Sequence, residues 1–264
     1  MTPDAPIAVF DSGVGGLTVL REIRVLLPAE SLVYLADSAW CPYGGRPLDQ
    51  VRERSVVIGR YMADEIGAKL LVVACNTASG AALEALRAAL PLPVVGMEPA
   101  VKPAVRATRN GKVGVLATEG TVASERFRRL VGAYGNGVEV IARGCSGLAD
   151  LVEEGEFEGE RVRAALETHL EPLREAGVDT VVLGCTHYPY LRGAIEEVLG
   201  KGVRLVDSAP AIARQTRRVL EERGLLAKGT EGWVRILTTG DPGEEGKVVA
   251  RLWPEPARME GVAV

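Results

Sequence analysis

The chain has 264 residues, of which 47% are hydrophobic and 25% charged, and its formal net charge is −4. A chain of this length and composition buries a substantial core as one large or two small domains, and its scattered basic residues argue against a nucleic-acid partner. The N-terminus carries no signal-peptide pattern and the later apolar runs are only strand-sized, which predicts a cytoplasmic protein with no membrane partner.

Short apolar strands alternate with amphipathic helices along the chain. In the first part, the pattern predicts strands at 7–10, 32–36, 70–74 and 94–96 and helices at 17–27, 48–66 and 81–90. After Pro99 the pattern starts again, with strands at 113–116, 138–142, 180–184 and 203–206 and helices at 124–131, 161–176 and 190–199. Strand–helix alternation of this kind is typical of βαβ units and a largely parallel sheet.

The two series of strands recur at nearly constant spacing. The offset is 106 residues for the first two pairs of strands, 110 for the third pair, counted from Cys75 to Cys185, and 109 for the fourth. A doubly wound α/β protein without duplication also has regularly spaced strands, but the matched cysteines favour an internal repeat. We therefore predict an α/β fold of two pseudo-symmetric domains, each with a mostly parallel sheet flanked by helices, and an active site in the cleft between them.

Cys75 and Cys185 each stand directly after an apolar strand. Because ligands bind at the carboxyl ends of the strands in open parallel sheets, each half is expected to contribute one of these thiols to the cleft. Two thiols in matching settings suit a reaction that removes a proton from one face of a carbon and returns a proton to the other face. Cys41 and Cys145 lack such a setting and are interpreted as structural.

The residues that follow the two cysteines indicate an acidic ligand. Helices are expected to begin near Ala78 and Pro189, so both thiols would lie close to helix N-termini, where the dipole favours the thiolate. The same N-termini, with the amide of Asn76 and the hydroxyls of Thr77 and Thr186, suit carboxylates. We therefore expect an anionic small molecule with an exchangeable proton.

Two further titratable residues are candidates for the same site. Asp11 follows the first strand, where it would orient a substrate ammonium or assist Cys75. His187 lies two residues past Cys185 and is placed to exchange protons with that thiol or with substrate. His169, the other histidine, falls in a predicted helix and is interpreted as a surface or packing residue.

The sequence predicts no cofactor and no metal. None of the six lysines lies at the carboxyl end of a predicted strand, where a pyridoxal Schiff base would be expected. Cys185 and His187 have no second pair of metal ligands at a fixed spacing. The glycine-rich loop at 11–18 lacks the third glycine of a dinucleotide fingerprint and contains no G-K-[ST], so a nucleotide site is a weak interpretation.

Five short strings carry a resemblance to the glutamate racemases. They are FDSGVGGLTV at 10–19, ADS at 36–38, PYG at 42–44, CNTAS at 75–79 and GCTHYP at 184–189, and the match runs in order from about residue 7 to 209. The resemblance implies a cofactor-independent enzyme that interconverts L- and D-glutamate and supplies D-glutamate for peptidoglycan synthesis. It also implies one α/β domain at 1–97 completed by 207–264, a second at 98–206, and a family that often forms homodimers.

The resemblance also implies roles for individual residues. Cys75 and Cys185 match the family's paired acid/base cysteines, of which one acts as thiolate while the other, as thiol, protonates the opposite face. Asp11 and His187 are the expected tuning groups, with Glu153 as an auxiliary carboxylate. The matching substrate-contacting positions are Asp11, Ser12, Tyr43, Gly44, Asn76, Thr77, Thr118, Thr121, Thr186 and His187.

Two stretches depart from the family's pattern. The string ATEGT at 117–121 stands where G-T-x-G-T is commoner, and Ser146 follows Cys145 where the family typically has proline. The second departure leaves the choice between Glu153 and Glu154 as the auxiliary carboxylate open.

Two other functions stay open at this stage. Aspartate and hydantoin racemases also pair two cysteines, but His187 after Cys185-Thr186 favours glutamate, since the aspartate enzymes more often have an acidic residue there. A two-lobed binding module for a small acid would share the cleft and the duplication. Such a module would not need two thiols at equivalent strand ends.

Overall fold

The computed structural model describes residues 2–135 and 137–264 and contains two sheets whose strands are all parallel. The six-stranded sheet has the order β10-β9-β2-β1-β3-β4 and the four-stranded sheet the order β6-β5-β7-β8. The strands are β1 (Ile7–Asp11), β2 (Leu32–Ala36), β3 (Leu70–Val73), β4 (Val94–Gly96), β5 (Lys112–Ala117), β6 (Glu139–Gly144), β7 (Thr180–Leu183), β8 (Arg204–Asp207), β9 (Val234–Thr238) and β10 (Met259–Gly261). The predicted α/β fold is confirmed.

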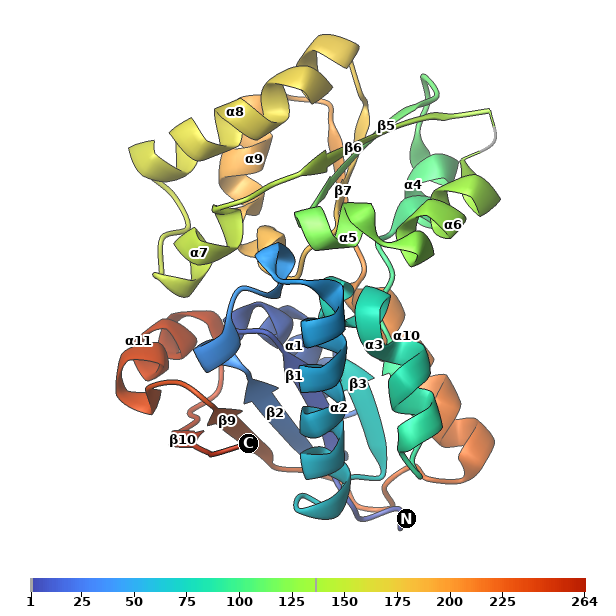
Figure 1. Ribbon diagram of the computed structural model, residues 1–264, viewed down its shortest axis with the longest axis vertical. Helices are drawn as coiled ribbons and strands as arrows, with labels where there is room; N and C mark the ends of the chain where they lie inside the picture. The colour runs from blue at the N-terminus through green and yellow to red at the C-terminus, as the bar shows by residue number, and fades with distance from the viewer. Residues whose placement is uncertain (1, 136) are drawn as a thin grey trace.

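Helices surround each sheet, and the two sheets with their helices form a first and a second lobe, drawn below and above in Figure 1. The helices of the first lobe are α1 (Leu17–Leu26), α2 (Leu48–Asp64), α3 (Asn76–Ala89), α10 (Ala209–Arg223) and α11 (Pro242–Leu252). Those of the second lobe are α4 (Val101–Ala107), α5 (Glu119–Ala123), α6 (Glu125–Tyr134), α7 (Leu148–Glu153), α8 (Glu160–Ala176) and α9 (Arg192–Leu199). None of the helices in the described ranges is long and apolar enough to span a bilayer.

Both faces of the six-stranded sheet are buried under helices. Ile7 and Val9 of β1 belong to the core that includes residues of α1 and α10, while Ala8 and Phe10 belong to the core that includes residues of α2 and α3. All four side chains are completely buried. A parallel sheet covered on both faces takes apolar residues at every position, which explains why the strand runs lack a polar alternation.

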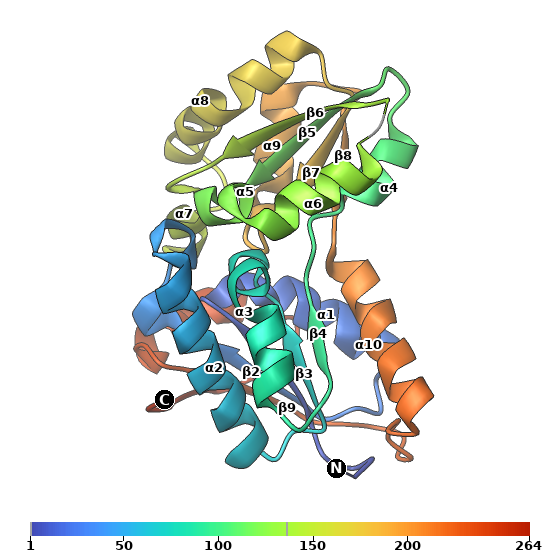
Figure 2. The ribbon, with the colours of Figure 1, turned by 45° about the vertical axis from the view of Figure 1, so that its right-hand side comes forward.

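The second lobe repeats the strand order of part of the first. The order β2-β1-β3-β4 corresponds to β6-β5-β7-β8. The C-terminal strands β9 and β10 extend the first sheet beside β2. Two chain segments connect the lobes, one after β4 and one between β8 and α10 (Figure 2), and the hydroxyl of Ser208 donates a 2.6 Å hydrogen bond across them to the carbonyl oxygen of Glu98.

Two helix starts differ from the prediction. α3 begins at Asn76, because Cys75 is extended and its sulfur caps the helix by accepting the N–H of Ala78 at 3.5 Å. Pro189 does not begin an α-helix but lies in the 3-10 helix Tyr188–Leu191, and α9 starts only at Arg192. The two cysteines therefore stand differently with respect to the helix that follows each.

Candidate active site

Cys75 and Cys185 lie at the carboxyl ends of β3 and β7 and line one narrow cavity between the lobes. They are 5% and 7% exposed. The cavity is lined by Ser12, Pro42, Tyr43, Gly44, Cys75, Asn76, Thr77, Thr118, Ala149, Gly184, Cys185, Thr186 and His187. Most of the residues singled out in the sequence thus meet at this cavity, whereas Asp11, Thr121 and Glu153 lie outside its lining.

Asp11 lies beneath the cavity. It is completely buried, its Oδ1 accepts the backbone N–H of Ser12 at 2.7 Å, and its Oδ2 accepts the hydroxyl of Thr186 at 2.8 Å. Burial raises the pKa of Asp11, although the charge of His187 and the hydrogen bonds oppose this in part. The carboxyl group therefore orients Ser12 and Thr186, both of which line the cavity.

His187 and Glu153 form a buried pair beside Cys185. His187 Nε2 lies 2.6 Å from Glu153 Oε1, and His187 Nδ1 lies 3.5 Å from Cys185 Sγ. Burial by itself would lower the pKa of His187, but interactions with Cys185 and Glu153 favour the protonated ring and raise this pKa well above its ordinary value. The imidazole connects the Cys185 thiol to a carboxylate outside the cavity.

Of the two candidate carboxylates at the end of α7, Glu153 is the one that reaches the site. Its Oε1 also accepts the backbone N–H of Val14 at 2.7 Å, which fixes it between the lobes. Glu154 instead forms an exposed ion pair with Arg161. The geometry thus favours Glu153 over Glu154 as the partner of His187.

The glycine-rich loop provides room for these second-lobe side chains. A Cβ atom on Gly13 would overlap the carboxylate of Glu153, and a Cβ on Gly15 would overlap the ring of His187. Residues Val14–Gly16 form a 3-10 helix that leads into α1. Close packing between the lobes therefore explains Gly13 and Gly15, and no phosphate-binding role is needed to account for them.

The surroundings of Cys75 favour the thiol form. Burial raises the pKa of Cys75 well above its ordinary value, the negative charge of Asp11 raises it further, and the N–H of Ala78 opposes the shift in part. Cys75 does lie at the N-terminus of α3, as expected, but its burial and the charge of Asp11 oppose the thiolate that the helix N-terminus favours. After Cys185 a four-residue 3-10 helix takes the place of the expected α-helix.

Three hydroxyls meet where the lobes touch. Thr77 Oγ1 lies 2.8 Å from Thr118 Oγ1 and 3.3 Å from Thr121 Oγ1. Thr118 lines the cavity, whereas Thr121 is 2% exposed and lies behind Thr77 and Thr118. A Cβ on Gly44 would come within 2.8 Å of Thr118 Cβ, so this glycine also permits close approach of the lobes. Thr121 supports the hydroxyl pair without facing the cavity.

Asn76 carries the clearest sign of a polar ligand. Its side chain is buried, and neither its Oδ1 nor its Nδ2 has a hydrogen-bond partner within residues 2–135 and 137–264. Leaving a buried amide unpaired costs about 1–3 kcal/mol. Because Asn76 lines the cavity, a bound polar molecule would satisfy this amide.

Tyr43 lines the cavity with its ring, while its hydroxyl is bonded to Asp37. The hydroxyl donates a 2.5 Å hydrogen bond to Asp37 Oδ2. Arg54 holds the same carboxylate through bonds of 2.9 and 2.6 Å. Burial raises the pKa of Tyr43, and the charge of Asp37 raises it further, so the phenol stays protonated. Arg54 is a positioning residue that the sequence analysis did not identify.

Cys41 lies closer to the site than its interpretation as a structural residue implied. Its sulfur, an oxygen of Glu153 and a ring nitrogen of His187 all lie within 4.8 Å of one another. In the sequence, Cys41 is notable only because it precedes the PYG string, and that position does not indicate that its sulfur lies near Glu153 and His187. Cys145, by contrast, is buried and its carbonyl oxygen accepts the hydroxyl of Tyr188 at 2.9 Å, as suits a structural residue.

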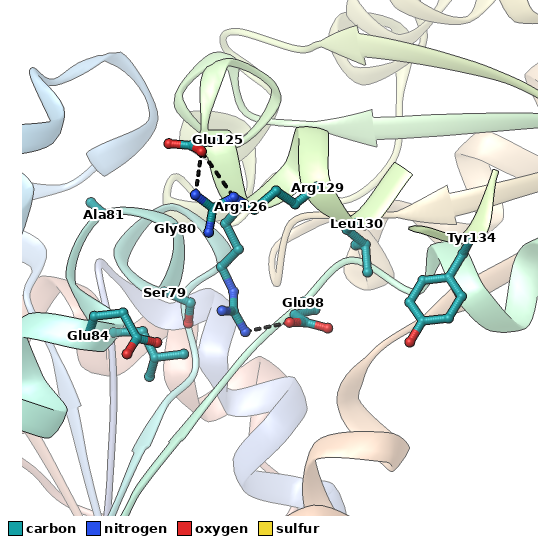
Figure 3. A pocket seen from close by; sticks show the side chains of 11 residues that line it. Ser79, Gly80, Ala81, Glu84, Glu98, Glu125, Arg126, Arg129, Leu130 and Tyr134 are labelled. Atoms are coloured by element: carbon teal, nitrogen blue, oxygen red, sulfur yellow. Dashed lines mark hydrogen bonds and ion pairs between the residues drawn. The ribbon is translucent and has the colours of Figure 1, made fainter. Parts of the chain in front are cut away.

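A larger cavity lies between α3 and α6 (Figure 3). Four of its charged side chains form two ion pairs, Arg126 with Glu98 and Arg129 with Glu125. Neither Cys75 nor Cys185 lines it. The smaller cavity is therefore the candidate active site on chemical grounds, despite its size.

Two α/β lobes that each present a cysteine to one cavity form an arrangement in which one thiol can take a proton from one face of a bound carbon while the other returns a proton to the opposite face. The model of the Asp/Glu/Hydantoin racemase family matches residues 13–216, and the chain belongs to this family. It is an isomerase that acts on amino acids.

Within the family, the chain is similar to glutamate racemases over nearly its whole length. It is 49% identical over 250 residues to the glutamate racemase of Pseudomonas paraeruginosa, with 94% of both chains covered. The fold is similar to that of a glutamate racemase isoform from Bacillus anthracis, with a TM-score of 0.88, 34% identity and 98% of each chain covered. It is also similar to Escherichia coli glutamate racemase in complex with L-glutamate and the activator UDP-MurNAc-ala, with a TM-score of 0.87, 37% identity and 98% of each chain covered.

Proposed function

We propose that this chain interconverts L- and D-glutamate without a cofactor and thereby supplies D-glutamate for peptidoglycan synthesis. The observation that carries the proposal is the meeting of Cys75 and Cys185, from equivalent strands of the two lobes, at one cavity. The identity of 49% to a glutamate racemase supports glutamate as the substrate.

The two thiols act on opposite faces of the α-carbon. One cysteine, as thiolate, takes the α-proton and becomes a thiol, while the other thiol gives its proton to the opposite face and becomes a thiolate. The planar carbanion between these steps has no handedness. Each turnover exchanges the protonation states of Cys75 and Cys185, and the reverse reaction restores them.

Polar groups of the cavity wall stabilise the carbanion through the substrate carboxylate, onto which the charge spreads. The amide of Asn76 lines the cavity without a partner in the described chain and is available as a donor, and the hydroxyls of Ser12, Thr118 and Thr186 lie beside it. The narrow space excludes water, which strengthens each of these interactions.

Different neighbours tune the two thiols. Asp11 favours the protonated form of Cys75, since its charge raises the pKa of that thiol. A protonated His187, held by Glu153, compensates a thiolate at Cys185. We therefore assign Asp11, His187 and Glu153 to positioning and tuning, with Cys75 and Cys185 as the acid/base pair.

The test is to incubate the purified protein with L-glutamate and, separately, with L-aspartate, without pyridoxal, and to resolve the products on a chiral column. D-Glutamate as the only product supports the proposal. D-Aspartate alone would assign the chain to a different member of the family. Solvent deuterium at the α-carbon of glutamate separates an enzyme from a binding module, which would leave the α-proton in place.

Three further parts of the proposal concern organisation. One domain comprises 1–97 with 207–264, and the other comprises 98–206. The membership of β9 and β10 in the first sheet supports this division. Limited proteolysis near 97–100 and 206–208 tests it.

The expected compartment is the cytoplasm, because the reaction needs free thiols and a reducing cytoplasm preserves them. A homodimer is the expected assembly, and sedimentation equilibrium tests it.

A further inference from the structure

We propose that Cys41, Glu153 and His187 form a binding site for a thiophilic divalent cation such as Zn²⁺, and that the bound cation inhibits the enzyme. The sulfur, carboxylate oxygen and ring nitrogen of these residues lie within 4.8 Å of one another. The binding part of this inference is independent of the proposed function, whereas the inhibition rests on it.

The donor set suits zinc. Thiolate, imidazole and carboxylate are its usual protein ligands, at about 2.0–2.3 Å from the metal, and three protein ligands leave a fourth position for water. Ligand atoms around such an ion are separated by roughly 3–4 Å. The three atoms lie within 4.8 Å of one another, and the 2.6 Å contact between His187 Nε2 and Glu153 Oε1 would open to admit the ion.

Each ring nitrogen of His187 has one neighbour beside the site. Nδ1 lies 3.5 Å from Cys185 Sγ, and Nε2 lies 2.6 Å from Glu153 Oε1. A cation placed at Nε2 would replace the proton that His187 shares with Glu153. Nδ1–H would then hold the ring in place by donating to Cys185, as the free nitrogen of a metal-bound histidine commonly does.

The site is largely shielded from water. His187 is 2% exposed, and the side chain of Glu153 is 18% exposed. Because zinc takes a thiolate and an unprotonated ring nitrogen, a cation that binds here displaces the protons of Cys41 and of the contact between His187 and Glu153.

Occupancy would stop racemisation in two ways. A His187 ring bound to a cation through Nε2 is held in one protonation state and no longer exchanges a proton with Glu153. Cys41 belongs to the first lobe, whereas Glu153 and His187 belong to the second, so the cation would also tie the lobes together and hinder exchange of substrate. The sequence predicted no metal site, because these three residues share no local spacing.

The test uses Zn²⁺ alone with the full chain, measured by titration calorimetry and by inhibition of D-glutamate formation. Cys41→Ala removes one ligand without touching the cavity lining, and Cys145→Ala removes another buried thiol as a matched control. We expect one Zn²⁺ per chain and inhibition that is weakened at least tenfold in Cys41→Ala and unchanged in Cys145→Ala, each compared with the activity of the same variant without Zn²⁺.

Substitution with Co²⁺ gives a readout that does not depend on activity. A thiolate-to-cobalt charge-transfer band should appear with the unsubstituted chain and with Cys145→Ala, and should disappear in Cys41→Ala. Equal Zn²⁺ inhibition in Cys41→Ala would overturn the inference and assign the metal to Cys75 and Cys185. Absence of calorimetric binding to the unsubstituted chain would overturn it as well. If Cys41→Ala fails to fold, Cys41→Ser serves in the same measurements.

Discussion

The hydroxyl of Thr186 donates a 2.8 Å hydrogen bond to Oδ2 of Asp11, a residue 175 positions earlier in the chain. Thr186 follows Cys185 of the second lobe, and Asp11 ends β1 beside β3, the strand that leads to Cys75. This bond couples the surroundings of the two thiols. Their unlike neighbours imply that the two directions of the reaction respond differently to substitutions.

Replacing either cysteine should nearly abolish racemisation. Cys75→Ser and Cys185→Ser each remove one of the two proton carriers, and we expect kcat to fall by about 10²- to 10⁴-fold in both directions. Chiral chromatography of timed reactions from L- and D-glutamate measures this. Cys145→Ser is the control and should stay active. Full activity in Cys75→Ser or Cys185→Ser would refute the two-thiol scheme.

Asp11→Asn should make Cys75 more acidic. The charge of Asp11 raises the pKa of Cys75, so its removal stabilises the thiolate and moves the midpoint of alkylation by iodoacetamide to lower pH. Peptide mass spectrometry follows alkylation of each cysteine as a function of pH. Cys145, whose pKa is raised to about 12 by burial without a contribution from Asp11, is the internal control. A Cys75 midpoint that stays or rises would contradict the assignment.

Gly15→Ala should damage the site without unfolding the chain. The added Cβ would overlap the His187 ring, which must move away from Cys185. Displacement of a reacting group by about 1 Å costs roughly 100-fold in rate, so we expect a loss of that order in kcat/KM. Gly45→Ala is the matched control, because a Cβ there has no heavy atom of the described chain within 4 Å. Equal activity of the two variants would argue against close packing at Gly15.

The buried ion pair of Lys69 and Glu30 should be essential for stability. The two side chains are 0% and 2% exposed, and Nζ lies 2.5 Å from Oε2. Lys69→Met leaves the Glu30 carboxylate buried and unpaired, which costs about 3–5 kcal/mol of unfolding free energy. Urea denaturation measures this. The double variant Lys69→Met/Glu30→Leu should recover part of the loss, and failure to do so would indicate that packing rather than charge explains the effect.

Asp179 should protect the second lobe against acid. Partial burial would raise its pKa, but hydrogen bonds from Thr108 and from the backbone N–H groups of Arg109 and Asn110 lower it from 3.8 to about 2. A carboxylate with a depressed folded-state pKa stabilises the fold above pH 3.8, and this contribution is lost as pH falls toward 2. Screening at this partly exposed site limits it to about 1 kcal/mol.

Asp179→Asn tests this contribution. The variant should have a lower Tm than the unsubstituted chain at pH 7, and the difference should shrink as pH falls from 4 to 2, because the aspartate becomes protonated first in the unfolded and then in the folded state. Thermal unfolding followed by circular dichroism at several pH values measures it. A difference that is independent of pH would show that the charge of Asp179 is unimportant.

Local patterns in the sequence determined the strands, their parallel arrangement and the position of Cys75 and Cys185 at strand ends. A strand buried on both faces requires a run of apolar residues, and such a run is visible without knowledge of the fold. The recurrence of these runs indicated two similar halves, and the strand orders β2-β1-β3-β4 and β6-β5-β7-β8 agree with that expectation. These features depend on short-range chemistry.

Only the tertiary structure decided which side chains meet and how water is excluded from them. The choice of Glu153 over Glu154 as the partner of His187, and the approach of Cys41 to both, follow from how the lobes pack. The sequence indicated a helix N-terminus that favours a thiolate at Cys75, and the structure adds burial and the charge of Asp11, which oppose it. Desolvation and charge across a lobe interface depend on distances in space, and no local spacing along the chain encodes them.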